Sequence, residues 1–309
     1  MRDLILKILN SIPESFLDKL LFIWRRSFFR KFKKSRELKL ANKRKLKHIQ
    51  HDGKISSQEL LIELRRFGIN KGDILFVQTS FNDLLTLEAN PYELINTLKK
   101  LVGSQGTLLT PAYTIPKLEK NWIFDPKLEP TYTGIVNEVF RRTPQAIRSL
   151  HPRHSVCGYG PLAKEILVGH EQCDYADGKG SPLDKIRLIP HSKILTLGLP
   201  RGFVSHHHWL EDFEPEKLPF PVHKESSDCY KVRKGDDSIV NVSDYNIKKG
   251  IALFGYDYEA IATNLSTNAL TTFLLKGITI CVYNMLPLSE ELKALRDDGL
   301  LQYKISRYK

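Results

Sequence analysis

A run of histidines followed by a glutamate is the clearest sign of chemistry in this sequence. Three consecutive histidines, residues 206–208, follow Ser205, and Glu211 lies three positions after His208. In a helix this spacing brings the His208 and Glu211 side chains to one face. A carboxylate that accepts a hydrogen bond from one imidazole nitrogen fixes the tautomer and raises the basicity of the other nitrogen. The pair therefore has the composition of a general base that works near neutral pH.

Two other interpretations of these residues stay open at this point. A histidine cluster can be an ordinary polar loop, and His-x-x-Glu alone has little specificity. Metal binding is the second alternative, because His206 and His208 alternate as ligands on a strand do. The spacing fixes no third ligand, so the sequence favours a site without metal.

An apolar run before the histidines predicts the strand that positions them. Residues 194–199 form a short segment without polar alternation, which is typical of a buried strand in a parallel sheet. Pro200, Gly202 and the histidines are then expected in the loop that leaves the carboxyl end of this strand. Open α/β sheets place their chemistry at that edge.

The other periodic segments predict an α/β fold, because strand and helix patterns alternate along the body. Beyond about residue 225 the patterns are weaker. Strands are expected over 73–80, 106–111, 194–199, 250–254 and 278–282, and helices over 57–68, 91–101, 133–142 and 288–299.

The net charge of +12 is distributed very unevenly. Residues 1–50 contain 15 Lys/Arg against 4 Asp/Glu, whereas the remainder contains 32 against 31. The basicity therefore belongs to an N-terminal arm, and the body gives no support for nucleic-acid binding. We expect two units, a basic helical arm over residues 1–50 and a catalytic domain over 51–309.

The arm mixes large aromatic side chains with cations, chiefly between residues 16 and 34. Such a segment can lie in a membrane interface, with its rings inserted and its cations facing anionic headgroups. A helix that packs on the body or on a partner subunit is the equal alternative, which leaves a homo-oligomer open. The sequence shows no spanning segment and no secretory signal. Four scattered cysteines without a CxxC pair favour reduced thiols in a cytoplasmic protein.

Several loop segments share their order and spacing with a known family. The pattern consists of hydroxyl residues after the first strand, a Gly-Thr-Leu strand ending at proline, an Arg-Ser-x-His-Pro-x-x-Ser segment, a Gly-x-Ser-Pro turn and a hydroxyl residue three before the histidine of His-x-x-Glu. In these features the chain resembles the aminoglycoside 3-N-acetyltransferase family over roughly residues 56–215. The matching segments are residues 77–81, 106–114, 124–126, 134–142, 148–156, 178–183 and 205–211.

The resemblance implies a three-layer α/β/α sandwich with a mostly parallel or mixed central sheet. It also implies direct transfer of an acetyl group from acetyl-CoA to an amine, with His208 and Glu211 as the catalytic pair. A hydroxyl such as that of Ser80 could stabilise the oxyanion. The residues expected on the coenzyme A side are Thr79, Ser80, Ser149, His151, Ser155, Gly180 and Ser181. Those expected to contact the acceptor are Tyr113, Asp125, His207 and Trp209.

The distribution of charge bears on the acceptor. A nearly neutral body with a basic arm suits an anionic acceptor better than a polycation. We therefore expect an amino sugar linked to a nucleotide or a lipid, as in surface polysaccharide assembly. An aminoglycoside acceptor, as in antibiotic resistance, is the alternative. A membrane-surface scaffold that has lost turnover is a third hypothesis, which the intact His-Glu pair disfavours.

Overall fold

The computed structural model describes residues 53–309, except 118, 120, 249–250, 252–254 and 308–309, together with scattered positions between 11 and 51. The aromatic and cationic run of the expected arm therefore lies largely outside the described residues. Within the described part of the chain, no helix combines the length and the apolar character needed to cross a bilayer.

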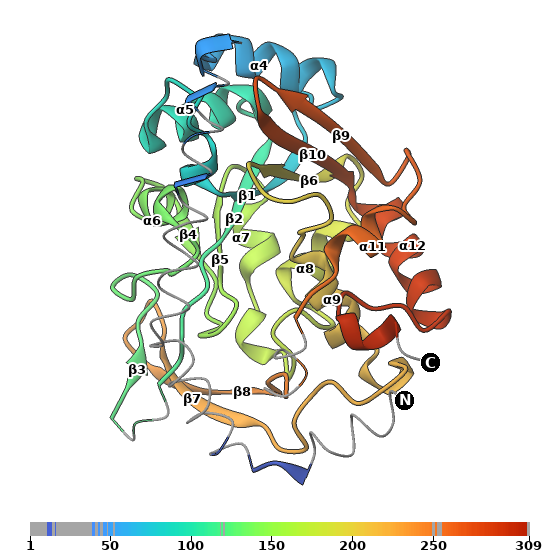
Figure 1. The fold of residues 1–309 in the computed structure, drawn as a ribbon. Coiled ribbons are helices and arrows are strands. Elements are labelled where there is room, and N and C mark those ends of the chain that lie inside the picture. The colour runs from blue at the N-terminus through green and yellow to red at the C-terminus, as the bar shows by residue number, and fades with distance from the viewer. Residues whose placement is uncertain are drawn as a thin grey trace.

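A seven-stranded mixed sheet forms the centre of the molecule (Figure 1). Its strands β2, β1 and β6 run parallel, and the outer strands pair antiparallel to their neighbours. Ile74 pairs with both Thr107 and Ser192, so the carboxyl ends of the three parallel strands lie at one edge. In spatial order the strands are β4 (Ile147–Arg148), β5 (Val156–Tyr159), β2 (Thr107–Pro111), β1 (Ile74–Thr79), β6 (Ser192–Leu197), β10 (Ile278–Asn284) and β9 (Leu270–Leu275).

Helices cover both faces of this sheet because its central strands are apolar on both sides. Leu75 and Val77 of β1 pack into one core, whereas Ile74 and Phe76 pack into the other. The first core includes α4 (Ser57–Arg66), α5 (Pro91–Val102) and α6 (Ile135–Arg141). The second includes α7 (Ala163–Leu167), α8 (Pro182–Arg187), α9 (His206–Phe213) and α12 (Met285–Asp297). The predicted three-layer α/β/α sandwich is confirmed.

The boundaries of several helices follow from capping residues in the sequence. Asn90 and Glu93 form a reciprocal capping box at the start of α5, where Pro91 occupies the first turn. Ser181 caps α8 without the reciprocal bond: its hydroxyl accepts from the Asp184 amide at 3.2 Å. The cap at Asn90 explains why the predicted helix limit near residue 91 agrees with the structure.

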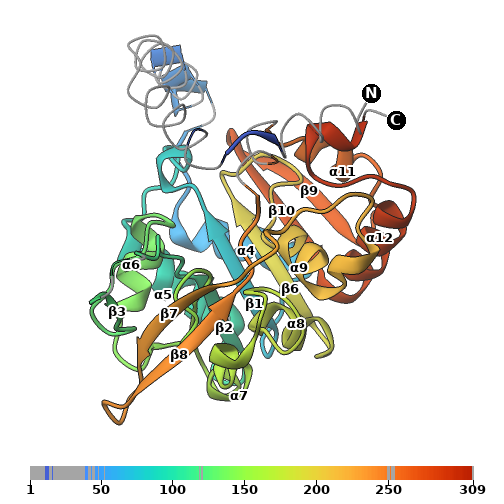
Figure 2. The ribbon, with the colours of Figure 1, turned by 90° about the horizontal axis from the view of Figure 1, so that it is seen from below.

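A second, small sheet projects from the main body (Figure 2). It contains β3 (Ile123–Phe124), β7 (Asp228–Arg233) and β8 (Ile239–Asp244), around a separate apolar cluster of Phe124, Val232 and Val242. The remaining described elements are α11 (Tyr258–Ala262) and the 3-10 turns η1 (Phe81–Asp83), η2 (His170–Gln172), η3 (Pro215–Lys217) and η4 (Lys304–Arg307).

One expectation from the sequence needs correction, and a second cannot be compared with the structure. The histidines are not in a loop: α9 begins at His206, with the His208 amide bonded to the Ser205 carbonyl at 2.9 Å. The turn after β6 is shorter than expected, because only residues 198–205 separate the strand from this helix. The strand expected over 250–254 falls mostly outside the described residues, and Ile251 is helical.

Candidate active site

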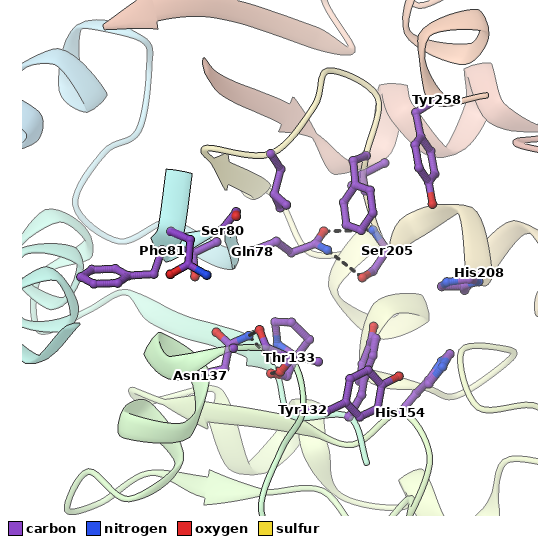
Figure 3. Close-up of a pocket in the computed structure, with 18 of the residues that line it drawn as sticks. Gln78, Ser80, Phe81, Tyr132, Thr133, Asn137, His154, Ser205, His208 and Tyr258 are labelled. Atoms are coloured by element: carbon purple, nitrogen blue, oxygen red, sulfur yellow. Dashed lines mark hydrogen bonds between the residues drawn. The ribbon is translucent and has the colours of Figure 1, made fainter. Parts of the chain in front are cut away.

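A pocket of about 640 Å³ opens at the carboxyl ends of the three parallel strands (Figure 3). Gln78 and Thr79 enter it from the end of β1, Pro111 from the end of β2, and Leu199 from just beyond β6. This is the edge where an open α/β sheet is expected to bind its ligands. Its volume lies within the range of roughly 300–1,000 Å³ that is usual for small-molecule sites.

His208 and Glu211 form the predicted pair at this pocket. His208 Nδ1 lies 3.2 Å from Glu211 Oε2, one turn further along α9. The other carboxylate oxygen of Glu211 accepts from Gln302 Nε2 at 2.7 Å, so the carboxylate is held at both ends. Glu211 is buried, whereas the His208 side chain is 24% exposed and lines the pocket. Because Glu211 accepts from Nδ1–H, the Nε2 atom of His208 is left as the basic nitrogen.

The surroundings of His208 raise its basicity. Burial by itself would lower the pKa of His208. The hydrogen bond and negative charge of Glu211, together with the charges of Asp177 and Asp212, outweigh burial and raise the pKa above its ordinary value. A histidine in this setting takes up a proton more readily than one in solvent.

The structure separates His208 from the other two histidines of the run. His206 is buried, stacks on Trp209 and bonds Ser289 through Nε2 at 2.7 Å. His207 is also buried and bonds the Gly202 carbonyl through Nε2 at 2.9 Å. Residues two apart on a helix point in nearly opposite directions, so His206 and His208 do not share a ligand site. Among the described residues, no three His, Cys, Asp or Glu side chains form a metal-binding group.

Two serines line the pocket, and their hydroxyl groups differ in their hydrogen-bond partners. The Ser80 hydroxyl donates to the Asp83 carboxylate, which occupies its one proton. The Ser205 hydroxyl instead accepts from Gln78 Nε2 at 2.9 Å, and the Ser205 amide donates to Gln78 Oε1 at 2.9 Å. Gln78 thus leaves the Ser205 proton unused, and the Tyr113 hydroxyl is the neighbouring acceptor. The oxyanion role of Ser80 stays a prediction, and the geometry favours Ser205 over it.

A second imidazole–carboxylate pair, which was not predicted from the sequence, borders the same pocket. His154 Nδ1 bonds Asp177, and the His154 ring lies between Tyr113 and His208, at centroid distances of 4.2 and 5.3 Å. Burial, followed by the charge of Arg153, lowers the pKa of His154 well below its usual value. His154 is thus a neutral neighbour of the basic His208. Its place three residues after His151 in the His-Pro segment was the available signal.

The structure brings together only part of the set expected to bind coenzyme A. Thr79 and Ser80 line the pocket. The other five residues do not line it, and the hydroxyls of the three serines among them are bonded within the fold. Ser149 bonds His170 and the Val156 amide, and Ser155 bonds the Ala112 carbonyl. His151 is buried beside His170, and Gly180 and Ser181 form the entry to α8. A role for these five in coenzyme A binding remains an untested prediction.

The residues expected to contact the acceptor divide in the same way. Tyr113 lines the pocket, but Asp125, His207 and Trp209 do not. Asp125 faces Arg233 at 3.4 Å, and buried Trp209 donates to Asp184 through Nε1 at 3.1 Å. The pocket instead recruits several residues outside the expected set, namely Tyr132, Asn137, His154, Phe203, Tyr256, Tyr258 and Gln302.

Known proteins are similar to this chain in sequence. A family model described as aminoglycoside 3-N-acetyltransferase matches residues 76–293. Aminoglycoside N(3)-acetyltransferase III of Acinetobacter baumannii is 32% identical over 166 residues, 48% of this chain and 57% of that protein. Aminoglycoside N(3)-acetyltransferase IX of Micromonospora chalcea is 27% identical over 239 residues, 69% of this chain and 83% of that protein. The chain thus spans little more than half the length of the Acinetobacter relative.

The fold is shared as well. The crystal structure of aminoglycoside acetyltransferase AAC(3)-Xa aligns with a TM-score of 0.70 at 20% sequence identity, covering 83% of this chain and 98% of that chain. An identity this low shows a common fold and nothing finer. The match to the family model, in contrast, runs from β1 to α12 and includes the His208–Glu211 pair. The chain therefore belongs to the aminoglycoside 3-N-acetyltransferase family.

Proposed function

We propose that this protein transfers the acetyl group of acetyl-CoA to an amine of an amino sugar, with His208 as the general base. The single observation that carries the proposal is the His208–Glu211 pair at the strand-end pocket, with Nδ1 and Oε2 3.2 Å apart and the glutamate buried. A positioned general base contributes typically about 10²–10⁴ in rate. The intact pair argues against a scaffold that has lost turnover.

The proton has a definite route in this reaction. The free amine attacks the thioester carbonyl carbon, which forms the C–N bond and a tetrahedral intermediate. His208 Nε2 takes the amine proton, and Glu211 stabilises the resulting imidazolium. The C–S bond then breaks, and the leaving thiolate takes the proton from His208. The products are the N-acetylated acceptor and coenzyme A thiol, so atoms and charge balance.

The oxyanion of the intermediate needs a hydrogen-bond donor. We assign this role to Ser205, because Gln78 donates to its oxygen at 2.9 Å and leaves its proton for the Tyr113 hydroxyl or for a substrate oxygen. Ser205 directly precedes α9, and both Ser205 and His208 line the pocket. A donor aimed at the developing charge lowers the barrier because it needs no reorganisation during the reaction.

The far end of the pocket fits the pantetheine arm of the co-substrate. Asn137 is buried there, and its side-chain oxygen has no hydrogen-bond donor in the described structure. Its amide nitrogen is used by the Thr133 carbonyl and hydroxyl, both at 3.0 Å. A buried, unpaired acceptor matches an amide N–H of pantetheine. A related protein of the same fold, AAC-IIIb (TM-score 0.63, 20% identity), has been solved as a binary structure with CoASH.

The names of the relatives bear on the identity of the acceptor. The curated relatives above are aminoglycoside N(3)-acetyltransferases, and this favours an aminoglycoside-type amine. It favours that alternative over the nucleotide- or lipid-linked amino sugar that the charge distribution suggested. The class common to both hypotheses is an amino sugar, and we adopt that class for the proposed activity.

The cellular location and the membrane contact are two further proposals, and each rests on its own observation. A cytoplasmic location agrees with four cysteines that are all unpaired. Peripheral membrane contact through residues 1–47 rests on the charge and aromatic content of the arm alone.

The proposed activity is tested by thiol release. Purified full-length protein is incubated with acetyl-CoA and a panel of amino sugars and aminoglycosides, and free coenzyme A is measured with a thiol reagent. We expect release that depends on the acceptor and on His208. Acceptor-independent release, or none with any amine, would overturn the proposal.

A further inference from the structure

The Glu211 carboxylate is bonded by a residue from a distant part of the chain. Gln302 lies 91 residues after Glu211, and its Nε2 atom donates to Glu211 Oε1 at 2.7 Å. The other oxygen, Oε2, lies 3.2 Å from His208 Nδ1. Gln302 is 3% exposed and Glu211 is 1% exposed, so little water competes for these bonds. With one partner on each oxygen, the carboxylate cannot turn without breaking a buried hydrogen bond.

The resemblance to known proteins does not account for this contact. The segments that share the family's sequence pattern end at Glu211, and the residues that match the family model end at 293. Gln302 lies beyond both. Its position beside the pair therefore has to be explained from this chain's own structure.

The chain that follows α12 returns to α9. Gly299, just after α12, has φ +84°, a left-handed conformation that turns the chain. Leu301 and Tyr303 flank Gln302, and both are buried in the same apolar core as Leu210 of α9. The packing of these two neighbours places Gln302 beside the pair.

Hydrogen bonds also fix the backbone around Gln302. Its carbonyl accepts from the Asp257 amide at 2.7 Å. The Ser306 hydroxyl lies 2.9 Å from the Leu301 carbonyl oxygen and 2.6 Å from that of Tyr303, and these two oxygens share its proton. The Gln302 side chain therefore extends from a fixed backbone, so little conformational entropy is lost when it bonds Glu211.

A neutral amide suits this position better than a cation. A lysine or arginine here would neutralise Glu211 and oppose the protonation of His208. Burial by itself lowers the pKa of His208, and the hydrogen bond and charge of Glu211 are the largest causes that raise it. Gln302 holds the carboxylate and leaves its full negative charge to stabilise the imidazolium.

The other ionisable groups around His208 do not depend on this contact. Asp177 and Asp212 also raise the pKa of His208, through their charges alone. Arg153, a nearby cation, is bonded to Asp244 at 2.8 Å. The remaining groups beside the pair are imidazoles whose pKa values are lowered and phenols whose pKa values are raised, so they are neutral near pH 7: His154, His207, Tyr256, Tyr258 and Tyr303.

We propose that Gln302 is a positioning residue for the reaction, whose side-chain amide holds the Glu211 carboxylate against His208 without neutralising it. The proposal rests on the acetyltransferase activity proposed above and adds the residue that orients its general-base pair. Because Gln302 acts on His208 through Glu211, its loss should lower kcat more than it weakens the binding of either substrate.

The first test replaces the amide by a side chain of similar size that cannot donate. Gln302→Met should lower kcat about tenfold or more, with the KM for acetyl-CoA and for the acceptor changed less than about threefold. Ser306→Ala is the matched control, because its hydroxyl anchors the same segment through the Leu301 and Tyr303 carbonyls. It should lower the thermal unfolding temperature and leave kcat close to wild type.

Two results of this comparison would overturn the proposal. Equal losses of kcat in Gln302→Met and Ser306→Ala would mean that Gln302 only stabilises its segment. Gln302 also lines the pocket, so a raised acceptor KM with unchanged kcat would assign it to substrate contact instead.

A double-mutant cycle tests whether Gln302 acts through Glu211. Glu211→Gln removes the charge that Gln302 is proposed to orient. We therefore expect Gln302→Met to lower kcat less than about twofold further in the Glu211→Gln background. Independent contributions multiply, so a further loss as large as that in the wild-type background would contradict the proposal.

Titration of His208 gives a readout that does not need turnover. Its imidazole signal, assigned by its absence in His208→Ala, is followed by NMR as the pH is changed. We expect a lower pKa of His208 in Gln302→Met than in wild type, because a carboxylate that is free to turn away stabilises the imidazolium less. An unchanged pKa would overturn the positioning role, whether or not the enzyme turns over. If no acceptor releases coenzyme A but the pKa falls, the proposed activity fails and the positioning of Glu211 by Gln302 stands.

Discussion

The proposed role of His208 as a base depends on what surrounds its Nδ1 atom. Glu211 accepts its hydrogen bond at 3.2 Å, and Gln302 holds the glutamate from the other side at 2.7 Å. The neighbouring His206 and His207 are also imidazoles, but their Nε2 atoms are hydrogen-bonded to Ser289 and to the Gly202 carbonyl. At the residue scale, therefore, hydrogen-bond partners select one histidine of three.

Removing the base tests this selection directly. We expect His208→Ala to lower kcat at least about 100-fold while the protein stays folded, because a general base contributes about 10²–10⁴. His207→Ala should reduce kcat less, since His207 lies outside the pocket lining. The measurement is steady-state coenzyme A release, with circular dichroism as the folding control. Near-wild-type turnover in His208→Ala would remove the pair from the mechanism.

The pH profile should report the influence of Glu211. Only the neutral imidazole accepts a proton, so kcat/KM should rise as pH increases through the pKa of His208, which lies above its ordinary value. Glu211→Gln removes the charge that favours the imidazolium, so the acidic limb should move to lower pH while kcat falls. Using one acceptor for both proteins keeps the titration of the amine constant. Identical limbs in the two profiles would contradict this assignment.

At the scale of elements, the turn between β6 and α9 brings α9 against Tyr258 of the pocket lining. Gly202 has φ +79°, and a Cβ there would lie 2.1 Å from the Tyr258 carbonyl oxygen. Its amide donates to Tyr283 Oη at 3.0 Å, and its carbonyl accepts from His207. Glycine is required both for the conformation and for this close approach.

Gly202→Ala should therefore damage both stability and acceptor binding. The left-handed conformation alone costs a non-glycine residue about 1–2 kcal/mol. Gly68→Ala is the matched control, because Gly68 has φ +87° and no atom within 4 Å of the added Cβ. We expect denaturant unfolding to show a larger loss for Gly202→Ala, accompanied by a raised acceptor KM as Tyr258 shifts. Equal losses in the two variants would mean that the contact with Tyr258 has no consequence.

The sequence predicted the elements with strong local patterns. Apolar runs identified β1, β2, β6 and β10, and the Asn90 cap with Pro91 located α5. The His-x-x-Glu spacing predicted the contact between His208 and Glu211 because its geometry is local to one helical turn. The second sheet escaped prediction, although β7 and β8 are each six residues long and their buried residues alternate with more exposed ones. The alternating Tyr230 and Val232 were the available signal.

The acceptor side of the pocket was not predictable in the same way. Tyr256, Tyr258 and Gln302 lie about 50 to 100 residues after His208 in the sequence and reach the pocket only through the tertiary fold. Conversely, Ser149 and Ser155 carry a recognisable motif but serve buried hydrogen bonds. A motif shows that residues occur together, and only packing shows which of them face the ligand.

For the molecule as a whole, we expect no metal requirement. His206 Nε2 is used by Ser289, and His208 Nδ1 is used by Glu211, so the two imidazoles do not converge. Dialysis against a strong chelator should leave coenzyme A release unchanged. Loss of activity that zinc restores would contradict the general-base assignment and support the metal alternative.

The last prediction concerns the basic arm, which lies largely outside the described residues. Residues 1–50 hold 15 Lys/Arg against 4 Asp/Glu, and a run containing Phe22, Trp24, Phe28 and Phe29 accompanies them. Cations near an anionic surface contribute about 1 kcal/mol each, and salt screens them. Deleting residues 1–47 should therefore abolish salt-sensitive binding to phosphatidylserine vesicles, measured by co-sedimentation. Acetyl transfer to a soluble acceptor should remain, because every pocket residue lies at position 78 or later.

If the full-length protein does not bind such vesicles at low salt, membrane contact is ruled out. A truncated protein that becomes insoluble or changes its oligomeric state would instead identify the arm as a packing element.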